Sequence, residues 1–252
     1  MKISTTVNHK NRIVGILIWL ILWQAAYLIV NKDIYIPSPV SVAASLGSLV
    51  ITTDFYKVVF YTTTRVLISF IISVVLGVTT GYICGVSKKT YEIFEPLVIF
   101  VRSTPIISII IIAIIWFNSS YVPIFTGVLM CFPIIWANMV EGIRSTDKKL
   151  LEMCKLYNVR KYEIFKRVYL KSSLPYLAAG FSSALGIAWK VVAAAEALSL
   201  PRYGVGTNLF NSKIYLKVPE LLAWTIIIII LSYMFEFFIK NIFKRIEVGK
   251  HD

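Results

Sequence analysis

The sequence predicts an all-α integral membrane protein with about six transmembrane helices and a helical hairpin on the cytoplasmic side. Hydrophobic residues make up 58% of the 252-residue chain, and its mean hydropathy is +0.76. So apolar a composition leaves too little polar surface for a water-soluble globule. The apolar residues also form long runs that are separated by short basic connections, which is the pattern of membrane-spanning helices.

Six apolar segments approach or exceed the roughly 20 residues that a helix needs to cross a bilayer. An even number of crossings places both termini on one side. The first segment follows a basic N-terminus, as in a signal peptide, but its length and the lack of a small-x-small cleavage site favour an uncleaved anchor. The segments are Ile13–Val30, Thr62–Val86, Phe94–Phe117, Pro123–Ile143, Leu174–Leu200 and Leu221–Ile239.

The distribution of positive charge predicts the orientation. A net charge of +13 would suggest nucleic-acid binding in a soluble chain, but here Lys and Arg are concentrated in the connections between apolar segments. Nine of them lie between Arg144 and Lys171. Because positively charged connections stay in the cytoplasm, we expect both termini and the connection 141–175 there, in a multi-pass protein of the cell (plasma) membrane. The partners expected at this stage are membrane lipids and no nucleic acid.

Apolar residues recur at helical spacing twice within the connection 141–175, which predicts two short amphipathic helices. Asn158 lies between them, and asparagine adopts the left-handed conformation at low cost, so Tyr157–Arg160 is expected to form a tight turn. Spacing alone leaves two alternatives: a docking element, or a basic hairpin that lies on an anionic leaflet. The two apolar stripes are Leu150, Leu151, Cys154 and Tyr157, and Ile164, Phe165, Val168 and Tyr169.

The same connection resembles the EAA loop of ABC importer permeases, whose pattern is Glu-Ala-Ala, three residues, Gly, about nine residues and Ile-x-Leu-Pro. Glu152-Met153-Cys154 occupies the Glu-Ala-Ala position, Asn158 replaces the glycine, and Leu174-Pro175 ends the pattern. Other motifs follow in the family's order over about residues 36–246, and together they resemble the nitrate, sulfonate and taurine permeases of the type I ABC importers. These motifs are Ile36-Pro37-Ser38-Pro39, Arg102-Ser103-Thr104-Pro105, Glu141-Gly142-Ile143-Arg144-Ser145, Ala188-Trp189, Ala194-Ala195-Glu196 and Tyr203-Gly204-Val205-Gly206.

This resemblance implies a permease subunit that works with three partners: a second permease copy in a homodimer, two copies of a cytoplasmic ABC ATPase, and an extracytoplasmic solute-binding protein. The solute would be nitrate, a sulfonate, taurine or a related small compound. The chain lacks a G-x-x-x-x-G-K-[ST] loop, so ATP and Mg²⁺ are expected on the partner ATPase and no cofactor in this chain. The expected domains are an anchor helix with its outer connection (1–57), a permease core (58–240, EAA loop about 145–173) and a basic tail (241–252).

By the same resemblance, the first helix of the hairpin is the coupling helix that enters a groove on the ATPase. Glu152 would be its charged contact and Asn158 its turn. The residues expected at this contact are Glu152, Met153, Cys154, Leu156, Asn158 and Val159.

Polar residues inside the apolar segments are candidates for the solute path, because an ionisable group at mid-membrane costs about 2.5–3.5 kcal/mol and usually faces protein or water. Lys190 and Glu196 fit best. They lie about 9 Å apart along a helix axis, which does not favour a pair between them, so Lys190 either attracts an anionic solute or pairs with a neighbouring helix. Further candidates are Trp189, Arg102 and Asn138. Arg65 is expected to anchor the start of its segment.

Four further expectations concern backbone geometry and metal binding. Pro96, Pro105, Pro123 and Pro133 are expected to interrupt the third and fourth segments, and a short outer helix is expected within 37–56. The Gly204-Val205-Gly206 stretch is expected to form an outer turn in which glycine permits a positive φ. The three cysteines are scattered and form no C-x-x-C pair, so no metal site is expected.

The residues leave one alternative function, an ion-coupled secondary transporter that uses Lys190 and Glu196 as a relay. The two halves of the sequence show no convincing repeat of the kind such transporters often carry. A membrane enzyme is disfavoured, because no nucleophile is accompanied by a base and an orienting group.

Overall fold

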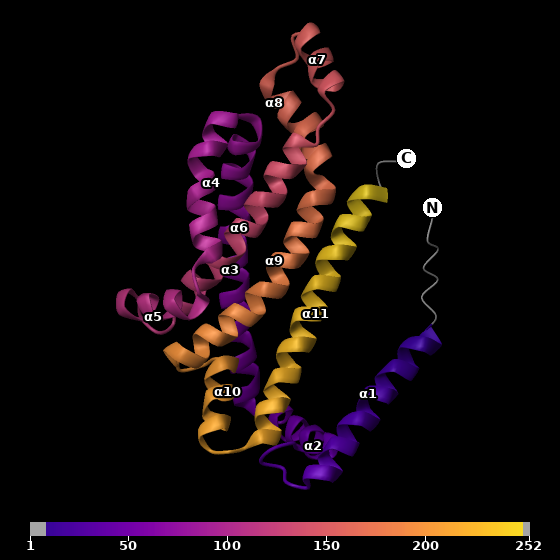
Figure 1. The fold of residues 1–252 in the computed structure, drawn as a ribbon, viewed down its shortest axis with the longest axis vertical. Coiled ribbons are helices and arrows are strands. Elements are labelled where there is room, and N and C mark those ends of the chain that lie inside the picture. Colours follow the sequence, from indigo (N-terminus) through magenta and orange to yellow (C-terminus); the bar gives the residue numbers. More distant parts are fainter. Residues whose placement is uncertain (1–8, 249–252) are drawn as a thin grey trace. The chain divides into compact units, whose positions relative to one another are not determined.

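The computed structural model describes residues 9–248, with side chains over residues 14–243, and this part of the chain is helical with no β-strand (Figure 1). Contacts divide it into two units. The smaller comprises Met1–Tyr56 and Asn208–Ile227, and the larger comprises Lys57–Thr207 and Ile228–Asp252. In chain order the elements are α1 (His9–Val30), α2 (Pro39–Val50), α3 (Thr53–Val86), α4 (Lys88–Ser103), α5 (Ile106–Trp116), α6 (Val122–Arg144), α7 (Lys148–Leu156), α8 (Lys161–Ile164), a π-helical turn (Phe165–Tyr169), α9 (Leu170–Ser199), α10 (Val205–Ile214) and α11 (Val218–Val248).

Within the described residues, four helices are long and apolar enough to cross a membrane, and the bent pair α4 and α5 adds a fifth if it is one span, compared with about six crossings in the prediction. The four are α3, α6, the continuous helix from Lys161 to Ser199, and α11 as far as Phe243. In α1 the described apolar part, Val14–Val30, is shorter. The predicted segments therefore coincide with helices, although several helices extend well beyond them.

The third predicted segment is two helices rather than one. The axes of α4 and α5 differ by 96°, and only together do they meet the length and composition of a span. Between them Thr104 has an extended backbone, with ψ of 128°. Proline disfavours the helical conformation in the residue before it and lacks an N–H for the helix ladder. The interruption predicted at Pro105 is thus confirmed, and it is a sharp bend. The other predicted interruptions are wrong: Pro96 and Pro133 lie inside α4 and α6, and Pro123 lies in the first turn of α6, where a missing N–H costs no helical hydrogen bond.

Glycines bring α3 close to α6. Three of them lie one turn apart on α3, and each faces an apolar side chain of α6. A Cβ atom at any of the three would come within 2.8 Å of the opposing side chain. Helices in lipid associate largely through van der Waals packing, which small residues at the interface permit. The pairs are Gly77 with Ile135, Gly81 with Met139 and Gly85 with Ile143.

A neighbouring face of α6 packs on α9 in a similar way. Gly142 lies against Ser173, and Gly180 lies against Asn138. Helix α6 therefore packs against both α3 and α9, and a core of buried side chains from all three fills the middle of the larger unit. This core consists of Val66, Phe70, Cys131, Ile135, Ala184, Leu185, Ala188, Trp189 and Val192, and residues of α11 such as Phe235 pack against it.

The smaller unit contains the predicted outer helix as α2. Ser38 caps it, since its hydroxyl accepts from the Ser41 N–H at 3.0 Å, and Pro39 occupies the first helical position. Proline is favoured there because no intrahelical N–H bond is lost. The indole N–H of Trp23 in α1 donates to the Pro37 carbonyl at 3.0 Å, which connects α1 to the start of α2.

The close approach of α3 and α6 gives a first testable prediction. We expect Gly81→Leu to lower the thermal stability of the detergent-solubilised protein by more than the roughly 1–3 kcal/mol typical of overpacking, because a Cβ atom alone already collides with Met139. Thermal scans of the monodisperse chromatographic peak measure the effect. Gly47→Leu is the matched control, since no atom lies within 4 Å of a Cβ atom there. Equal stability of the two variants would contradict the packing argument.

Candidate functional site

The hairpin of α7 and α8 is built by caps at both ends of α7. The Asp147 carboxylate accepts from the Lys149 N–H at 2.8 Å at the start of the helix. At its end Asn158 has a φ of 48°, the Val159 N–H donates to the Cys154 carbonyl at 2.9 Å, and the Asn158 N–H donates to the Lys155 carbonyl at 3.1 Å. These bonds form a Schellman motif with asparagine at the left-handed position. The predicted tight turn is confirmed.

The second predicted helix of the hairpin differs from expectation, because it is not short. It begins at Lys161 and continues to Ser199. The predicted apolar stripe nevertheless packs inward, with the Tyr82 ring of α3 lying 4.6 Å from Phe165 and 5.9 Å from Tyr169, centroid to centroid. Pro175 does not end the helix, since membrane helices tolerate proline when neighbouring groups satisfy the freed carbonyl. A turn that was predicted to dock is therefore continuous with a helix long enough to span the bilayer.

The outward side of α7 is apolar. Met153, Leu156 and Tyr157 are 53%, 80% and 77% exposed, whereas Leu151 and Cys154 are half-buried on the inward side. Exposed Glu152 adjoins this surface, which we call the α7 outer face and define as Glu152, Met153, Leu156 and Tyr157. All six residues predicted at the ATPase contact lie on α7 or its terminal turn, so the structure brings them together.

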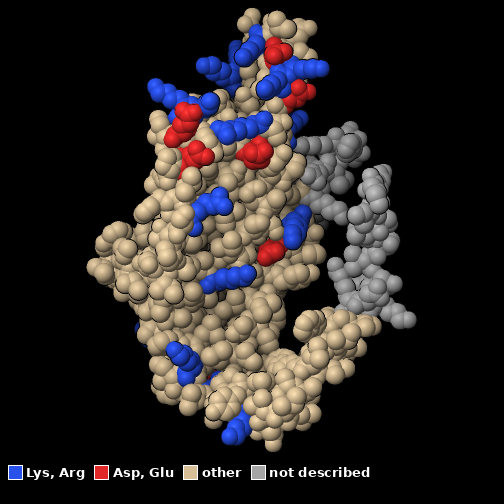
Figure 2. All heavy atoms as spheres, in the orientation of Figure 1, with Lys and Arg blue, Asp and Glu red and all other residues tan. Residues whose placement is uncertain are grey.

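The same end of the molecule is strongly charged. Figure 2 shows Lys and Arg side chains crowding around the end that carries α7 and becoming sparse over the middle. A cavity of about 620 Å³ lies beside the start of α7 and is lined by residues of α3, α4, α6 and α7. On its wall the Arg144 guanidinium stacks 3.8 Å above the Tyr91 ring, whose hydroxyl donates to Glu95 at 2.7 Å. These contacts brace the base of α7 against the start of α4.

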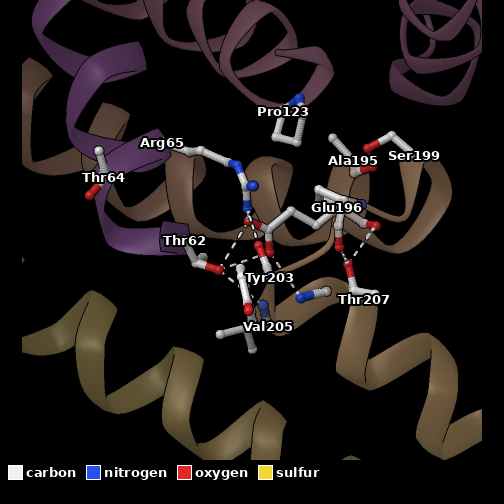
Figure 3. Close-up of polar contacts among 12 residues, drawn as sticks. Thr62, Thr64, Arg65, Pro123, Ala195, Glu196, Ser199, Tyr203, Val205 and Thr207 are labelled. Atoms are coloured by element: carbon white, nitrogen blue, oxygen red, sulfur yellow. Dashed lines mark hydrogen bonds and ion pairs between the residues drawn. The ribbon is translucent and has the colours of Figure 1, made fainter. Parts of the chain in front are cut away.

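A buried polar cluster lies far from α7, where α9 ends (Figure 3). Glu196 is fully buried and accepts from the Arg65 guanidinium at 2.6 Å and from the Thr62 hydroxyl at 3.0 Å. The Gly206 N–H donates to the same carboxylate at 3.0 Å, and Arg65 also donates to the Tyr203 carbonyl at 2.6 Å. We call this cluster the Glu196 clasp: Thr62, Arg65, Glu196, and the backbone of Tyr203 and Gly206. It joins α3, α9 and the connection to α10.

The clasp corrects two expectations from the sequence. Arg65 does not anchor its helix at the interface; it is only 6% exposed and is enclosed among protein groups, because α3 begins earlier, at Thr53. Neither Gly204 nor Gly206 has a positive φ. Glycine is required there by close approach, since a Cβ atom would meet the Glu196 carboxylate at position 204 and the Ala193 carbonyl at position 206.

The residues predicted to line a solute path are dispersed. Glu196 belongs to the clasp, and Trp189 is fully buried in the core of the larger unit. Asn138 is half-buried and donates to the Ile134 carbonyl at 2.8 Å. Lys190 and Arg102 are exposed, and neither has an ion-pair partner among the described side chains. Sequence reasoning did not single out Thr62, although its spacing of three from Arg65 places both on one side of α3.

No group of three or more His, Cys, Asp and Glu side chains comes together as a metal site within the described residues. That the chain needs no cofactor of its own remains a prediction.

Comparisons with known proteins agree on one family. The model of the family described as "Binding-protein-dependent transport system inner membrane component" matches residues 74–248. The putative aliphatic sulfonates transport permease protein SsuC of Bacillus subtilis is 24% identical over 89% of this chain and 82% of its own length. The taurine transport system permease protein TauC of Escherichia coli is 21% identical over 89% of this chain and 83% of its own length.

A bicarbonate transport system permease protein, CmpB of Synechococcus elongatus, is 25% identical over 59% of this chain and 54% of its own length. Among solved structures, a chain of the MetNI methionine ABC transporter in an inward-facing conformation matches with a TM-score of 0.67. The match covers 76% of this chain and 95% of that one at 18% identity, so it shows a shared fold.

The Glu196 clasp generates a second prediction. We expect Glu196→Ala to destabilise the protein by about 3–5 kcal/mol, since it leaves the Arg65 guanidinium buried without its counter-ion. Glu196→Gln keeps an acceptor and should cost less. Midpoints of thermal unfolding in detergent measure both. The Arg65→Met, Glu196→Met double variant should recover part of the loss, because it removes both charges, and a double variant less stable than Glu196→Ala would contradict the pairing.

Proposed function

The chain belongs to the binding-protein-dependent transport system inner membrane components, and from this membership we propose that its α7 outer face docks on a cytoplasmic ATPase and that it carries a small oxyanion. Members of the family are permease subunits of ABC importers. The chain is therefore a non-catalytic membrane subunit that forms the solute pathway, while a separate subunit hydrolyses ATP. Because the chain belongs to this family, the alternative function that the residues alone left open, an ion-coupled secondary transporter, is excluded.

The observation that supports the docking proposal is the exposure of large apolar side chains on α7. Leu156 and Tyr157 are about four-fifths exposed beside Glu152. A contiguous exposed apolar surface rimmed by polar groups is typical of a protein contact. The chain's own core does not need these side chains, which leaves them available to a groove on the ATPase, with Cys154, Asn158 and Val159 holding the helix and its turn.

Continuity of α8 with α9 supports a coupling route. The docked turn lies at the end of a helix that runs without a break from Lys161 to Ser199. Movement of the ATPase subunits as they close on ATP and Mg²⁺ would carry α7 with them and rotate that helix as a body. A change at the ATPase thereby reaches the part of the chain that lines the pathway.

The complete importer, in this proposal, contains a homodimer of the chain, two ATPase subunits and an extracytoplasmic solute-binding protein. The basic α7 end faces the cytoplasm in this proposal, since Lys and Arg gather at that end (Figure 2) and positive connections remain inside. A cytoplasmic location of both termini stays a prediction from the sequence. Relatives named for aliphatic sulfonates, taurine and bicarbonate support a small oxyanion as solute. Lys190, Arg102 and Asn138 are the proposed pathway residues that are not fully buried.

Docking is tested by Leu156→Asp. A charge in the middle of an apolar contact that buries this side chain should abolish co-purification of the ATPase in mild detergent and solute-stimulated ATP hydrolysis in proteoliposomes. The fold should survive, because Leu156 is 80% exposed. Ile51→Asp, at a residue that is 85% exposed on the proposed outer side, is the matched control and should behave as the parent. Retention of the ATPase by Leu156→Asp at parental levels would refute α7 as the docking element.

The turn that ends α7 gives a separate prediction. Asn158→Gly should leave ATPase co-purification unchanged, because glycine adopts a positive φ freely. Asn158→Val should reduce it, since a β-branched residue at a φ of 48° costs about 1–2 kcal/mol and disfavours the Schellman turn. The measurement is the amount of ATPase that co-purifies per amount of permease, quantified on a stained gel for each variant. Equal recovery with valine and glycine would show that the turn geometry does not matter for docking.

A further inference from the structure

A carboxylate of α11 lies directly against α9 at a glycine. A Cβ atom built at Gly186 would be 2.6 Å from Oε1 of Glu236, so a larger residue there would make the end of the Glu236 side chain move. On the other side of Glu236, the Lys240 ammonium lies 3.7 Å away, one turn along α11. The Glu236 side chain is 30% exposed and that of Lys240 is 64% exposed.

A second lysine lies one helical turn from the glycine that the Glu236 carboxylate contacts. Lys190 is one turn beyond Gly186 on α9, and residues four apart on a helix are neighbours on one face. Trp189 and Phe235, the residues that precede Lys190 and Glu236, pack with ring centroids 5.6 Å apart. This contact in the core fixes the register of α11 on α9. The Glu236 carboxylate is therefore positioned between Lys240 and the turn of α9 that carries Lys190.

This charged group lies along two helices that are long and apolar enough to cross a membrane. Gly186 is thirteen residues before the end of α9 at Ser199, or about 20 Å along a helix, and Glu236 lies on α11 within the described stretch Val218–Phe243 that meets this criterion. Figure 2 shows an acidic group beside basic ones on the otherwise apolar middle of the molecule. Ionisable side chains at such depth almost always face protein or water, yet Lys190 is exposed on the surface of the single chain.

We propose that Lys190, Glu236 and Lys240 form an anion-binding element on the wall of the solute pathway, in which Glu236 occupies the place of the solute when none is present. This inference rests on the proposed function. Two ammonium groups and one carboxylate leave one positive charge, which favours a small anion over a cation. The Glu236 carboxylate is similar in charge and size to the carboxylate or sulfonate group of a small anionic solute. A solute in the pathway therefore competes with Glu236 for the two lysines.

The arrangement lets an anion cross without being trapped. Two lysines with no counter-ion would hold an anion tightly in a medium of low dielectric constant. Glu236 offsets their charge before the solute arrives and again after it leaves. The glycine at 186 is part of this element, because a larger residue would displace the carboxylate from the lysines.

The experiment introduces a thiol beside the element and keeps all three charges. Ser183 is exposed on α9 and lies three residues before Gly186 on the same face. The Ser183→Cys variant, assembled with its ATPase and binding protein in nanodiscs, is treated with sulfonatoethyl methanethiosulfonate or its trimethylammonium analogue. The rate ratio of the anionic to the cationic reagent is compared with that of a free thiol in solution, and the parent protein with its three native cysteines supplies the blank.

We expect both reagents to reach the thiol introduced by Ser183→Cys and the anionic one to be favoured. Lys190→Gln should lower the rate ratio by about tenfold, and Glu236→Gln should raise it by a similar factor, because one unit charge roughly 10 Å away acts in opposite directions on the two reagents. Lys88→Gln is a matched control at the α7 end of the molecule and should leave the ratio unchanged. Each variant is first checked for a monodisperse assembly.

Three results would overturn the inference. They are no modification by either reagent, a faster reaction with the cationic reagent, and a rate ratio that neither Lys190→Gln nor Glu236→Gln changes. The first would mean that this face lies against lipid or another protein surface. Co-purification of the ATPase is measured in the same preparations, so its absence would count against the proposed function itself. Its presence together with one of these three results would count against the anion-binding element alone.

Discussion

The close approach of α6 to both α3 and α9 is the constraint on which the larger unit depends. Lipid supplies little hydrophobic drive for helices to associate, so contact area must come from backbones that lie near one another. Gly77, Gly81 and Gly85 provide it between α3 and α6, and Gly142 and Gly180 provide it between α6 and α9. The three helices then act as one body, to which both the α7–α8 hairpin and the clasp are attached.

That body separates two sites of different character. The α7 outer face is exposed, apolar and mounted on a capped turn, as suits a surface that another protein covers. The Glu196 clasp is buried and held by several hydrogen bonds, and it fixes the connection that follows α9 to α3. Charged side chains are thus exposed around α7 or paired in the interior, as Arg65 and Glu196 are. Lys190 is an exception, because it is exposed on α9 between these two sites.

Sequence reasoning succeeded where the signal is local. The apolar segments, the α7 stripe and the turn at Asn158 each depend on residues within a few positions, and all appear as helices or as a turn. It failed where the partner is distant. Arg65 and Glu196 are 131 residues apart, so the pair has no local signature. The glycines at 204 and 206 were interpreted as backbone freedom, because the atoms that approach them belong to α9.

The continuous helix from Lys161 to Ser199 has a mechanical consequence. Its 39 residues form a lever about 58 Å long, so a tilt of roughly 5° shifts one end relative to the other by about 5 Å. The π-helical turn at Phe165–Tyr169 lies close to the α7–α8 hairpin, and the residue that a π turn adds rotates this hairpin relative to the long arm. In the proposed complex, small angular changes at the ATPase surface would thereby be converted into displacements as large as the solute itself.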